Sequence, residues 1–430
     1  MTSDGERPQW FDSPLFPRIF QTFRMAIQPS KIIIAFLAIA IICLAGWLMD
    51  FSRTVVATQD PSGTVTELSV FVTMPDQIKS YIEQARATGE RTGVFTTLGN
   101  FLLARYHDAL KALFDLDLTR VAIDIEDCLK AMAWAIDYHP LYCIVFSIIT
   151  LAVFAVAGGA ICRIAALQFA QGEKPGLTEA VRFGMTRFPS FLAAPLIPAA
   201  IILGAGVFIF VLGLLGNIPR LGEIIVGLSV AIAFVAGAFM ALMAIGTIAG
   251  FTLMFPAIAY DGLDCYDAIS RSFNYIYARP WRMGFYSALA TIYGSICYIF
   301  VRFFIFLLIL ITRSFFRLAI WADSSTGVNK LQAIWPEPHF GALLGLRNPT
   351  PTIWSESLAA FLINIFLLVV TGSIVSFAVS FYFSANTIIY ALMRYRVDKT
   401  PLEDICRHRA DEAADTQPLD AQQQTLPSRE

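Results

Sequence analysis

Charged side chains are scarce in this sequence, and their scarcity indicates the class of protein. Only 15% of the 430 residues are Asp, Glu, Lys or Arg, and 57% are hydrophobic. Soluble domains carry about a quarter charged residues, so the composition excludes an ordinary soluble domain and indicates a polytopic membrane protein. The formal net charge of -2 offers no basic surface for nucleic acid, so we expect no nucleic-acid partner.

Histidine and cysteine are also few, and neither occurs at the spacing of a metal or catalytic site. The four histidines are isolated, and the seven cysteines contain no CxxC motif. Cys43, Cys162 and Cys297 lie inside apolar runs and are interpreted as small core residues. The carboxylates of Asp124, Glu126 and Asp127 are interpreted as a solvated helix face. We therefore expect no enzyme activity, no catalytic residue, no metal and no cofactor.

Six apolar runs are long enough to cross about 30 Å of hydrocarbon. They cover residues 32–49, 141–162, 191–216, 226–255, 284–311 and 355–393. The predicted fold is all-α: a polytopic membrane helical bundle of about six transmembrane helices, with amphipathic cytoplasmic connector helices and a helical extracytoplasmic insertion. In sequence order, we predict a cytoplasmic interfacial segment at 1–30, the first transmembrane helix at 31–49, the insertion at 50–138, the five-helix remainder at 139–393 with an outer loop at 313–354, and a cytoplasmic tail at 394–430, disordered from about residue 407.

The insertion shows helical periodicity in two stripes. One stripe is Leu98, Leu102, Tyr106, Leu110 and Leu113, and the other is Val121, Ile125, Cys128, Leu129 and Met132. These stripes predict helices that pack on one another or on the membrane.

The distribution of basic residues predicts the orientation. Seventeen of the 31 Lys and Arg residues lie before the first run, in 163–190, in 255–283 or after Met393, mostly in short segments. The positive-inside rule places these segments in the cytoplasm, and with them both termini. We expect a multi-pass protein of the bacterial cytoplasmic membrane, in contact with membrane lipids and with candidate protein partners.

Three segments before apolar runs share one layout, an amphipathic stretch with arginines and aromatics that ends in proline. The most distinct is Gly262–Arg282, whose apolar stripe is Ala268, Ile269, Ser272, Phe273 and Ile276. Arginine reaches lipid phosphate and aromatics prefer the headgroup region, which favours connectors at the membrane interface. The candidate interface residues are Arg24, Pro29, Arg182, Arg187, Pro189, Arg271, Arg279, Pro280, Trp281 and Arg282.

The stretch FPAIAYDGLDCYDAISRSFNYIYARPWRMGF resembles bacterial six-helix integral membrane proteins related to the membrane domain of glycerophosphodiester phosphodiesterases. The residues that carry the resemblance are Pro256, Gly262, Ala268, Ile269, Arg271, Ser272 and Trp281, and YALMRYRVDKTPLEDI is similar to that group's last exit from the membrane. The resemblance covers about residues 140–405 and implies a membrane module. The insertion, the 313–354 loop and the lack of a phosphodiesterase domain depart from the group, so no catalytic activity is carried over.

The last two apolar runs are longer than one crossing needs, and they leave their course open: an extension outside the bilayer, a re-entry or a strong tilt. They also contain the candidate polar path, Arg302 and Asn364, although interfacial and interhelical contacts explain these residues more simply. Two functions follow. The first is a non-catalytic scaffold or accessory factor of the cell envelope, and the alternative is a small-molecule or lipid transporter with a cavity between the spans.

Overall fold

The computed structural model describes residues 16–60, 63–115, 117–323, 327, 329–341, 343 and 353–406. The chain folds as two compact units. The first unit comprises Met1–Phe36, Phe154–Ser314 and Asn364–Glu430, and the second comprises Leu37–Val153 and Phe315–Ile363. The predicted loss of order from residue 407 lies outside the described residues.

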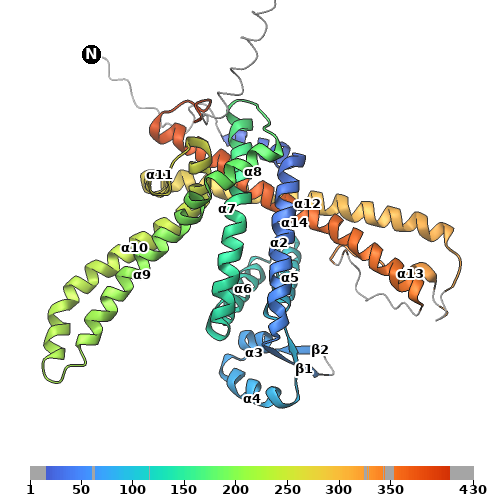
Figure 1. Cartoon of the computed structure of the whole chain (residues 1–430), viewed down its shortest axis with the longest axis horizontal. Helices are drawn as coiled ribbons and strands as arrows, with labels where there is room; N and C mark the ends of the chain where they lie inside the picture. The colour runs from blue at the N-terminus through green and yellow to red at the C-terminus, as the bar shows by residue number, and fades with distance from the viewer. Residues whose placement is uncertain are drawn as a thin grey trace, which may run out of the picture. The chain divides into compact units, whose positions relative to one another are not determined.

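Six long helices dominate the fold (Figure 1). They are α2 (Pro29–Met49), α7 (Pro140–Ala170), α9 (Phe188–Leu215), α10 (Gly222–Asp261), α12 (Pro280–Ala319) and α14 (Trp354–Asp398). Among the described residues, these six are the helices that are long and apolar enough to cross a membrane. The predicted all-α membrane bundle is therefore confirmed, and the chain is a multi-pass membrane protein.

Three of these helices are longer than a single crossing requires. Helices α10 and α12 have 40 residues each and α14 has 45. At 1.5 Å per residue, 40 residues extend about 60 Å, roughly twice the hydrocarbon thickness. The predicted outer loop at 313–354 is accordingly shorter at its start, because α12 continues to Ala319 and the short helix α13 (Lys330–Ile334) follows.

Short helices precede three of the long ones, where the connectors are predicted. They are η1 (Phe16–Gln21) with α1 (Thr22–Ala26), α8 (Leu177–Thr186) and α11 (Cys265–Ala278). The connector prolines Pro29, Pro189 and Pro280 all fall in the first turn of the following long helix. Proline suits that turn because its missing N–H would have no helical partner there. It thus begins the span as well as ending the connector.

The core of the first unit gathers near the short helices. Buried residues run from Ala155 to Leu167 on α7, from Leu253 to Tyr260 on α10 and from Ile388 to Met393 on α14. Glycines permit the closest contacts: a Cβ on Gly158 would lie 2.6 Å from the Phe383 ring. Larger residues there would push the helices apart.

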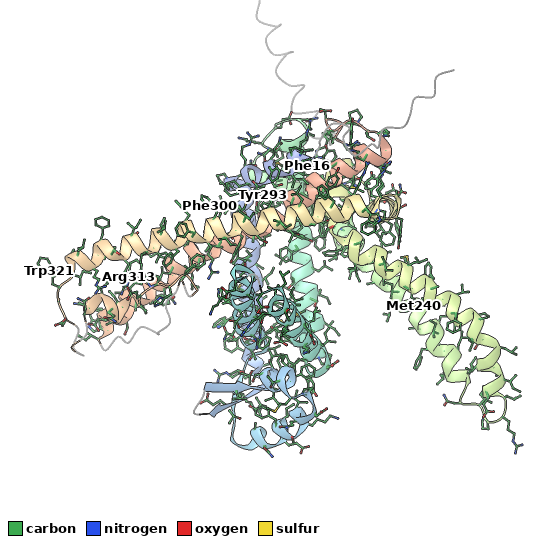
Figure 2. All side chains as sticks on the ribbon, turned by 180° about the vertical axis from the view of Figure 1, so that it is seen from behind. Phe16, Met240, Tyr293, Phe300, Arg313 and Trp321 are labelled. Atoms are coloured by element: carbon green, nitrogen blue, oxygen red, sulfur yellow. The ribbon has the colours of Figure 1, made fainter. Side chains whose placement is uncertain are left out.

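The far parts of α9 and α10 form an exposed apolar hairpin within the first unit. The two helices run side by side (Figure 1), and Met240 of α10, labelled in Figure 2, extends toward Gly206 of α9. Leu228 is 77% exposed and Phe234 74% exposed. Such a surface is compatible with lipid tails, which are as apolar as these side chains.

The N-terminal segment packs on α12 through aromatic rings. The ring centres of Phe20 and Tyr293 are 4.9 Å apart and those of Phe23 and Phe300 are 6.1 Å apart, and both pairs meet edge-to-face. The Tyr293 hydroxyl also donates to the Phe20 carbonyl at 3.0 Å. Tyr293 and Phe300 follow one another along α12 in Figure 2, so the contact extends over about two turns of that helix.

The insertion is helical with one small sheet. Its elements are η2 (Asp50–Ser52), β1 (Val55–Asp60), β2 (Gly63–Thr66), α3 (Glu67–Thr73), η3 (Pro75–Gln77), α4 (Ile78–Thr88), β3 (Glu90–Thr92), α5 (Val94–Phe114) and α6 (Leu118–Tyr138). The strands are antiparallel in the order β2-β1-β3, with Thr58 opposite Val65 and Val56 opposite Arg91. The sheet is absent from the sequence prediction because its strands are short, although their valines and threonines suit strands.

The insertion has its own hydrophobic core, and only one of its two predicted stripes contributes to it. The buried core is Val55, Leu68, Val72, Ile78, Val94, Ala131, Trp134 and Ala135, and Leu98 and Leu102 of the first stripe pack against it. On α6 the buried face is instead Asp124, Ala131, Trp134 and Ala135. The prediction of a solvated face is therefore wrong for Asp124, which is 3% exposed and faces Arg105 at 3.6 Å.

Candidate functional site

The Gly262–Arg282 connector begins at a sharp turn and continues as α11. Gly262 has a φ of +64°, a left-handed conformation that glycine adopts without strain. Asp264 then caps α11 by accepting a hydrogen bond from the Asp267 backbone N–H at 2.9 Å. The buried face of α11 is Ala268, Ile269, Ser272, Tyr275 and Ile276, which matches the predicted stripe except that Tyr275 replaces Phe273.

Glycines on α10 allow α11 to lie back along it. A Cβ on Gly246 would lie 3.0 Å from the Phe273 ring, and one on Gly250 would lie 3.1 Å from Ile276. The Tyr277 hydroxyl donates to the Leu242 carbonyl at 2.5 Å. The connector is thus packed against a span along most of its length.

Asp261, the last residue of α10, is the centre of a buried polar cluster. Its side chain is 6% exposed, and Arg394 Nε lies 3.1 Å from one carboxylate oxygen. Arg271 Nη1 lies 2.9 Å from the other oxygen, to which the Tyr390 hydroxyl donates at 2.5 Å. We call Asp261, Arg271, Tyr390 and Arg394 the Asp261 cluster. It connects α10, α11 and α14, and the sequence alone does not bring its members together.

Arg394 extends the cluster to the segment that follows α14. Its Nη1 donates to the Asp404 carbonyl at 2.7 Å, and its guanidinium lies 5.3 Å from the centre of the Tyr260 ring. The Tyr260 hydroxyl donates to the Leu402 carbonyl. The start of the predicted cytoplasmic tail is therefore bound to the ends of α10 and α14.

A second arginine reinforces the same end of the unit from α7. Arg163 is 3% exposed, and its Nη1 donates to the Ala259 carbonyl at 3.1 Å and to the Cys406 carbonyl at 2.9 Å. Its guanidinium also lies 4.9 Å from the centre of the Phe183 ring of α8. The Ala259 carbonyl lies in the last turn of α10, where it has no helical donor, so Arg163 satisfies a buried group that would otherwise lack one.

The chemistry of this region is that of a structural clamp. The Tyr275 hydroxyl donates to Asp398 at 2.5 Å, and burial, aided by that hydrogen bond, raises the pKa of Tyr275 so that the phenol stays neutral. The carboxylate of Asp261 faces two guanidinium groups and a phenol. Among the described residues, no group of three or more His, Cys, Asp or Glu is arranged to hold a metal ion.

Sequence reasoning missed Lys31 near the start of α2. The side chain is fully buried, and its Nζ lies 2.9 Å from Gln168 Oε1, 3.2 Å from the Met25 carbonyl and 3.5 Å from Ser384 Oγ. The lysine therefore joins the N-terminal segment to α7 and α14 through neutral oxygens. The only signal in the sequence is its position two residues after Pro29, which suggests an interface residue.

The predicted interface residues are mostly at the surface. Six of them are exposed: Arg24, Pro29, Arg182, Pro189, Pro280 and Trp281, the last with an exposed fraction of 87%. The other four are partly covered: Arg187, Arg271, Arg279 and Arg282. Arg271 alone among these residues belongs to the Asp261 cluster.

The two residues of the candidate polar path differ in exposure. Arg302 on α12 is 5% exposed and donates to the Tyr298 hydroxyl, one turn earlier, at 3.3 Å. Asn364 on α14 is exposed. The described structure gives Arg302 an interior position and Asn364 a surface position.

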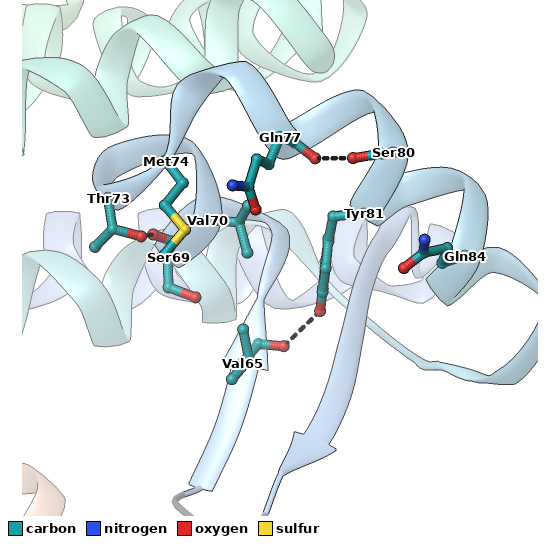
Figure 3. A pocket seen from close by; sticks show the side chains of 9 residues that line it. All are labelled: Val65, Ser69, Val70, Thr73, Met74, Gln77, Ser80, Tyr81 and Gln84. Carbon is teal, nitrogen blue, oxygen red and sulfur yellow. Dashed lines mark hydrogen bonds between the residues drawn. The ribbon is translucent and has the colours of Figure 1, made fainter.

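A pocket of about 360 Å³ lies in the insertion, between β2, α3 and α4 (Figure 3). Its lining is uncharged: Val65, Ser69, Val70, Thr73, Met74, Gln77, Ser80, Tyr81 and Gln84. The Tyr81 hydroxyl donates to the Val65 carbonyl at 2.8 Å, which fixes the ring across the pocket. Its volume falls in the range of ligand pockets, and the hydroxyls and amides around it offer hydrogen bonds without charge.

Comparisons of the chain with models of known families, with curated proteins and with solved structures give no match. The resemblance of Gly262–Arg282 to the six-helix membrane group therefore stays a prediction.

Proposed function

We propose that the chain is a non-catalytic integral membrane protein of the cell envelope, a scaffold or accessory factor that contacts lipids and partner proteins. The observation that carries this proposal is a contrast between two polar regions. In the Asp261 cluster the charged groups face one another and hold α10, α11 and α14 together. In the insertion, uncharged polar groups line an open pocket instead.

This contrast separates a structural role from a binding role. A charge that is buried and fully paired supports the architecture, and it cannot change partners without a large cost. The insertion has its own hydrophobic core around Trp134, so its surface can bind another molecule without a change of fold. The partner suited to the pocket is a protein segment with neutral hydrogen-bonding and apolar groups, because a charged side chain would find no counter-charge among the lining residues.

The proposal includes the bacterial cytoplasmic membrane, with both termini in the cytoplasm and amphipathic connectors on its inner surface. The basic residues of the short segments support this orientation. A cysteine at position 279, in an Arg279→Cys variant, should react with an impermeant maleimide only after the cells are permeabilised. Labelling above that of the unsubstituted chain in intact cells would overturn the orientation.

The binding role can be tested by filling the pocket. Thr73 lines it and is exposed, so a Thr73→Trp change should occupy the cavity without disturbing the core. Lys79 is also exposed but is not one of the lining residues, and Lys79→Trp is the matched control. After purification in mild detergent, a protein identified by mass spectrometry should accompany the wild type and K79W, and its recovery should fall severalfold with T73W. Equal recovery with both variants, or no accompanying protein, would count against the proposal.

A transporter is the second candidate, and Arg302 is the observation that favours it. A buried arginine in an apolar helix is a common mark of a substrate or ion site in membranes. Small molecules and lipids that accompany the purified wild type and Arg302→Gln can be compared by mass spectrometry. A bound solute or anionic lipid that is lost with R302Q, in the absence of a protein partner, would replace the scaffold proposal with the transporter.

A further inference from the structure

Helix α6 carries a row of exposed apolar side chains on the side away from its buried face. The row is Leu118, Ile125, Leu129, Met132 and Ile136, with exposed fractions of 69%, 55%, 66%, 48% and 58%. With 3.6 residues per turn, the five positions fall within a sector of about 60°. We call this row the α6 stripe. Contiguous exposed apolar surface of this kind indicates a contact with something other than water.

The charged residues of α6 lie off the stripe. Asp124 faces Arg105 at 3.6 Å on the buried side. Lys130 lies 2.9 Å from Glu126 on a flank of the helix. The stripe itself therefore presents a charge-free surface, which suits hydrocarbon better than a polar protein face.

Both ends of the α5–α6 pair are attached at the ends of spans. Asp50, just after α2, accepts hydrogen bonds from the backbone N–H groups of Phe95 and Thr96 at 2.8 Å each, at the start of α5. The Phe95 ring also packs against Gly46 of α2, where a Cβ would lie 2.4 Å from it. At the other end, only His139 separates α6 from α7. The pair therefore begins beside the end of α2 and ends beside the start of α7.

Exposed apolar side chains also occur directly after the α6 stripe in the chain, at the start of α7 in the same unit. Leu141, Ile144 and Ile148 are 75%, 58% and 61% exposed in the first turns of that span. In a membrane protein this surface of α7 faces lipid. The same kind of surface thus extends from the span onto the neighbouring helix.

We propose that α6 lies on the membrane as an interfacial helix, with the α6 stripe buried among phospholipid acyl chains. The occupant of the stripe is lipid, because exposed apolar residues of a span follow the stripe directly in the chain and the α5–α6 pair is attached beside the ends of two spans. The inference is independent of the proposed scaffold role and of which side of the membrane the insertion occupies.

The test uses the full chain in phospholipid membranes, with a diazirine amino acid placed at Leu129. The matched control has the same amino acid at Glu126, three residues earlier on a flank, where the side chain is 63% exposed. After illumination, mass spectrometry should find phospholipid adducts severalfold more often at position 129 than at 126. Equal yields of water adducts at both positions would show that the stripe faces solvent. A cross-linked dimer formed through position 129 would assign the stripe to a second copy. Either outcome overturns the proposal.

Discussion

Replacement of Asp261 by asparagine should destabilise the first unit strongly. The substitution keeps the size of the side chain and removes its charge, while the Arg394 guanidinium, 8% exposed, stays buried opposite a neutral amide. Removal of one partner of a buried ion pair costs about 3–5 kcal/mol, because the remaining charge is left uncompensated. The exposed carboxylate of Asp404 lies 3.4 Å from Arg394 Nη2 and compensates part of that charge, so we expect D261N to lower the free energy of unfolding by at most that amount.

Arg271 provides the matched comparison on the same carboxylate. Its side chain is 41% exposed, so water screens its ion pair with Asp261. Exposed pairs contribute about 0–1 kcal/mol, and Arg271→Gln should therefore have a much smaller effect than D261N. Thermal unfolding of the purified proteins in one detergent, followed by circular dichroism, ranks the variants by stability. A double variant, D261N with Arg394→Met, should be less destabilised than the sum of the two single changes, since neither charge is left alone.

The stability losses of these variants show which ion pair of Asp261 is stronger. If R271Q is as damaging as D261N, exposure does not decide the strength of the two pairs. If D261N unfolds at the wild-type temperature, Asp261 is not the centre of the clamp.

Three further predictions concern other parts of the fold. Burial lowers the pKa of His139, even though a Glu67 carboxylate oxygen lies 3.8 Å from its Nε2. The His139 contribution to stability should therefore be complete above the ordinary pKa of about 6.5 and lost as the pH falls toward the lower folded value. His139→Gln should remove this dependence from pH-dependent melting curves. Gly262→Ala should lower the free energy of unfolding by about 1–2 kcal/mol, because alanine is strained in the left-handed backbone conformation. The loss should exceed that of Gly172→Ala in the same melting assay: Gly172 also has a positive φ but has open space around it, whereas a Cβ at 262 would lie 3.0 Å from Cys406 Sγ. Equal losses of stability would argue against the contact. Asp50→Ala should lower the free energy of unfolding by about 0.5–2 kcal/mol, because it removes the carboxylate that caps the start of α5. Backbone amides in the first turn of α5 should then exchange hydrogen faster, and unchanged exchange there would contradict the assigned cap.

The two apolar stripes of the insertion show where sequence periodicity reaches its limit. Both predict helices, and α5 and α6 are present. Periodicity cannot distinguish an apolar face that packs in a core from one that meets lipid, because both exclude water. Asp124 illustrates the same limit: it reads as a surface carboxylate until Arg105, on another helix, compensates its burial.

The sequence predicts the Gly262–Arg282 connector well as a local feature. Its turn, its helix and four of its five buried positions follow from residue spacing, capping chemistry and the proline that begins α12. The contacts that hold the connector to distant helices do not follow from the sequence. Asp261, Tyr390 and Arg394 are separated by up to 133 residues, and nothing in a single sequence states that they meet.

The sequence by itself determined that this protein is a helical membrane protein with six spans and short helices before three of them. Hydrophobicity, helical period and proline act over a few turns, so they can be read from neighbouring residues. Only the tertiary structure decided that the charges near Asp261 form a clamp, that Lys31 is buried among neutral oxygens, and that the α6 stripe is turned outward. Each of these depends on contacts between distant segments, whose energies arise only when the helices are packed.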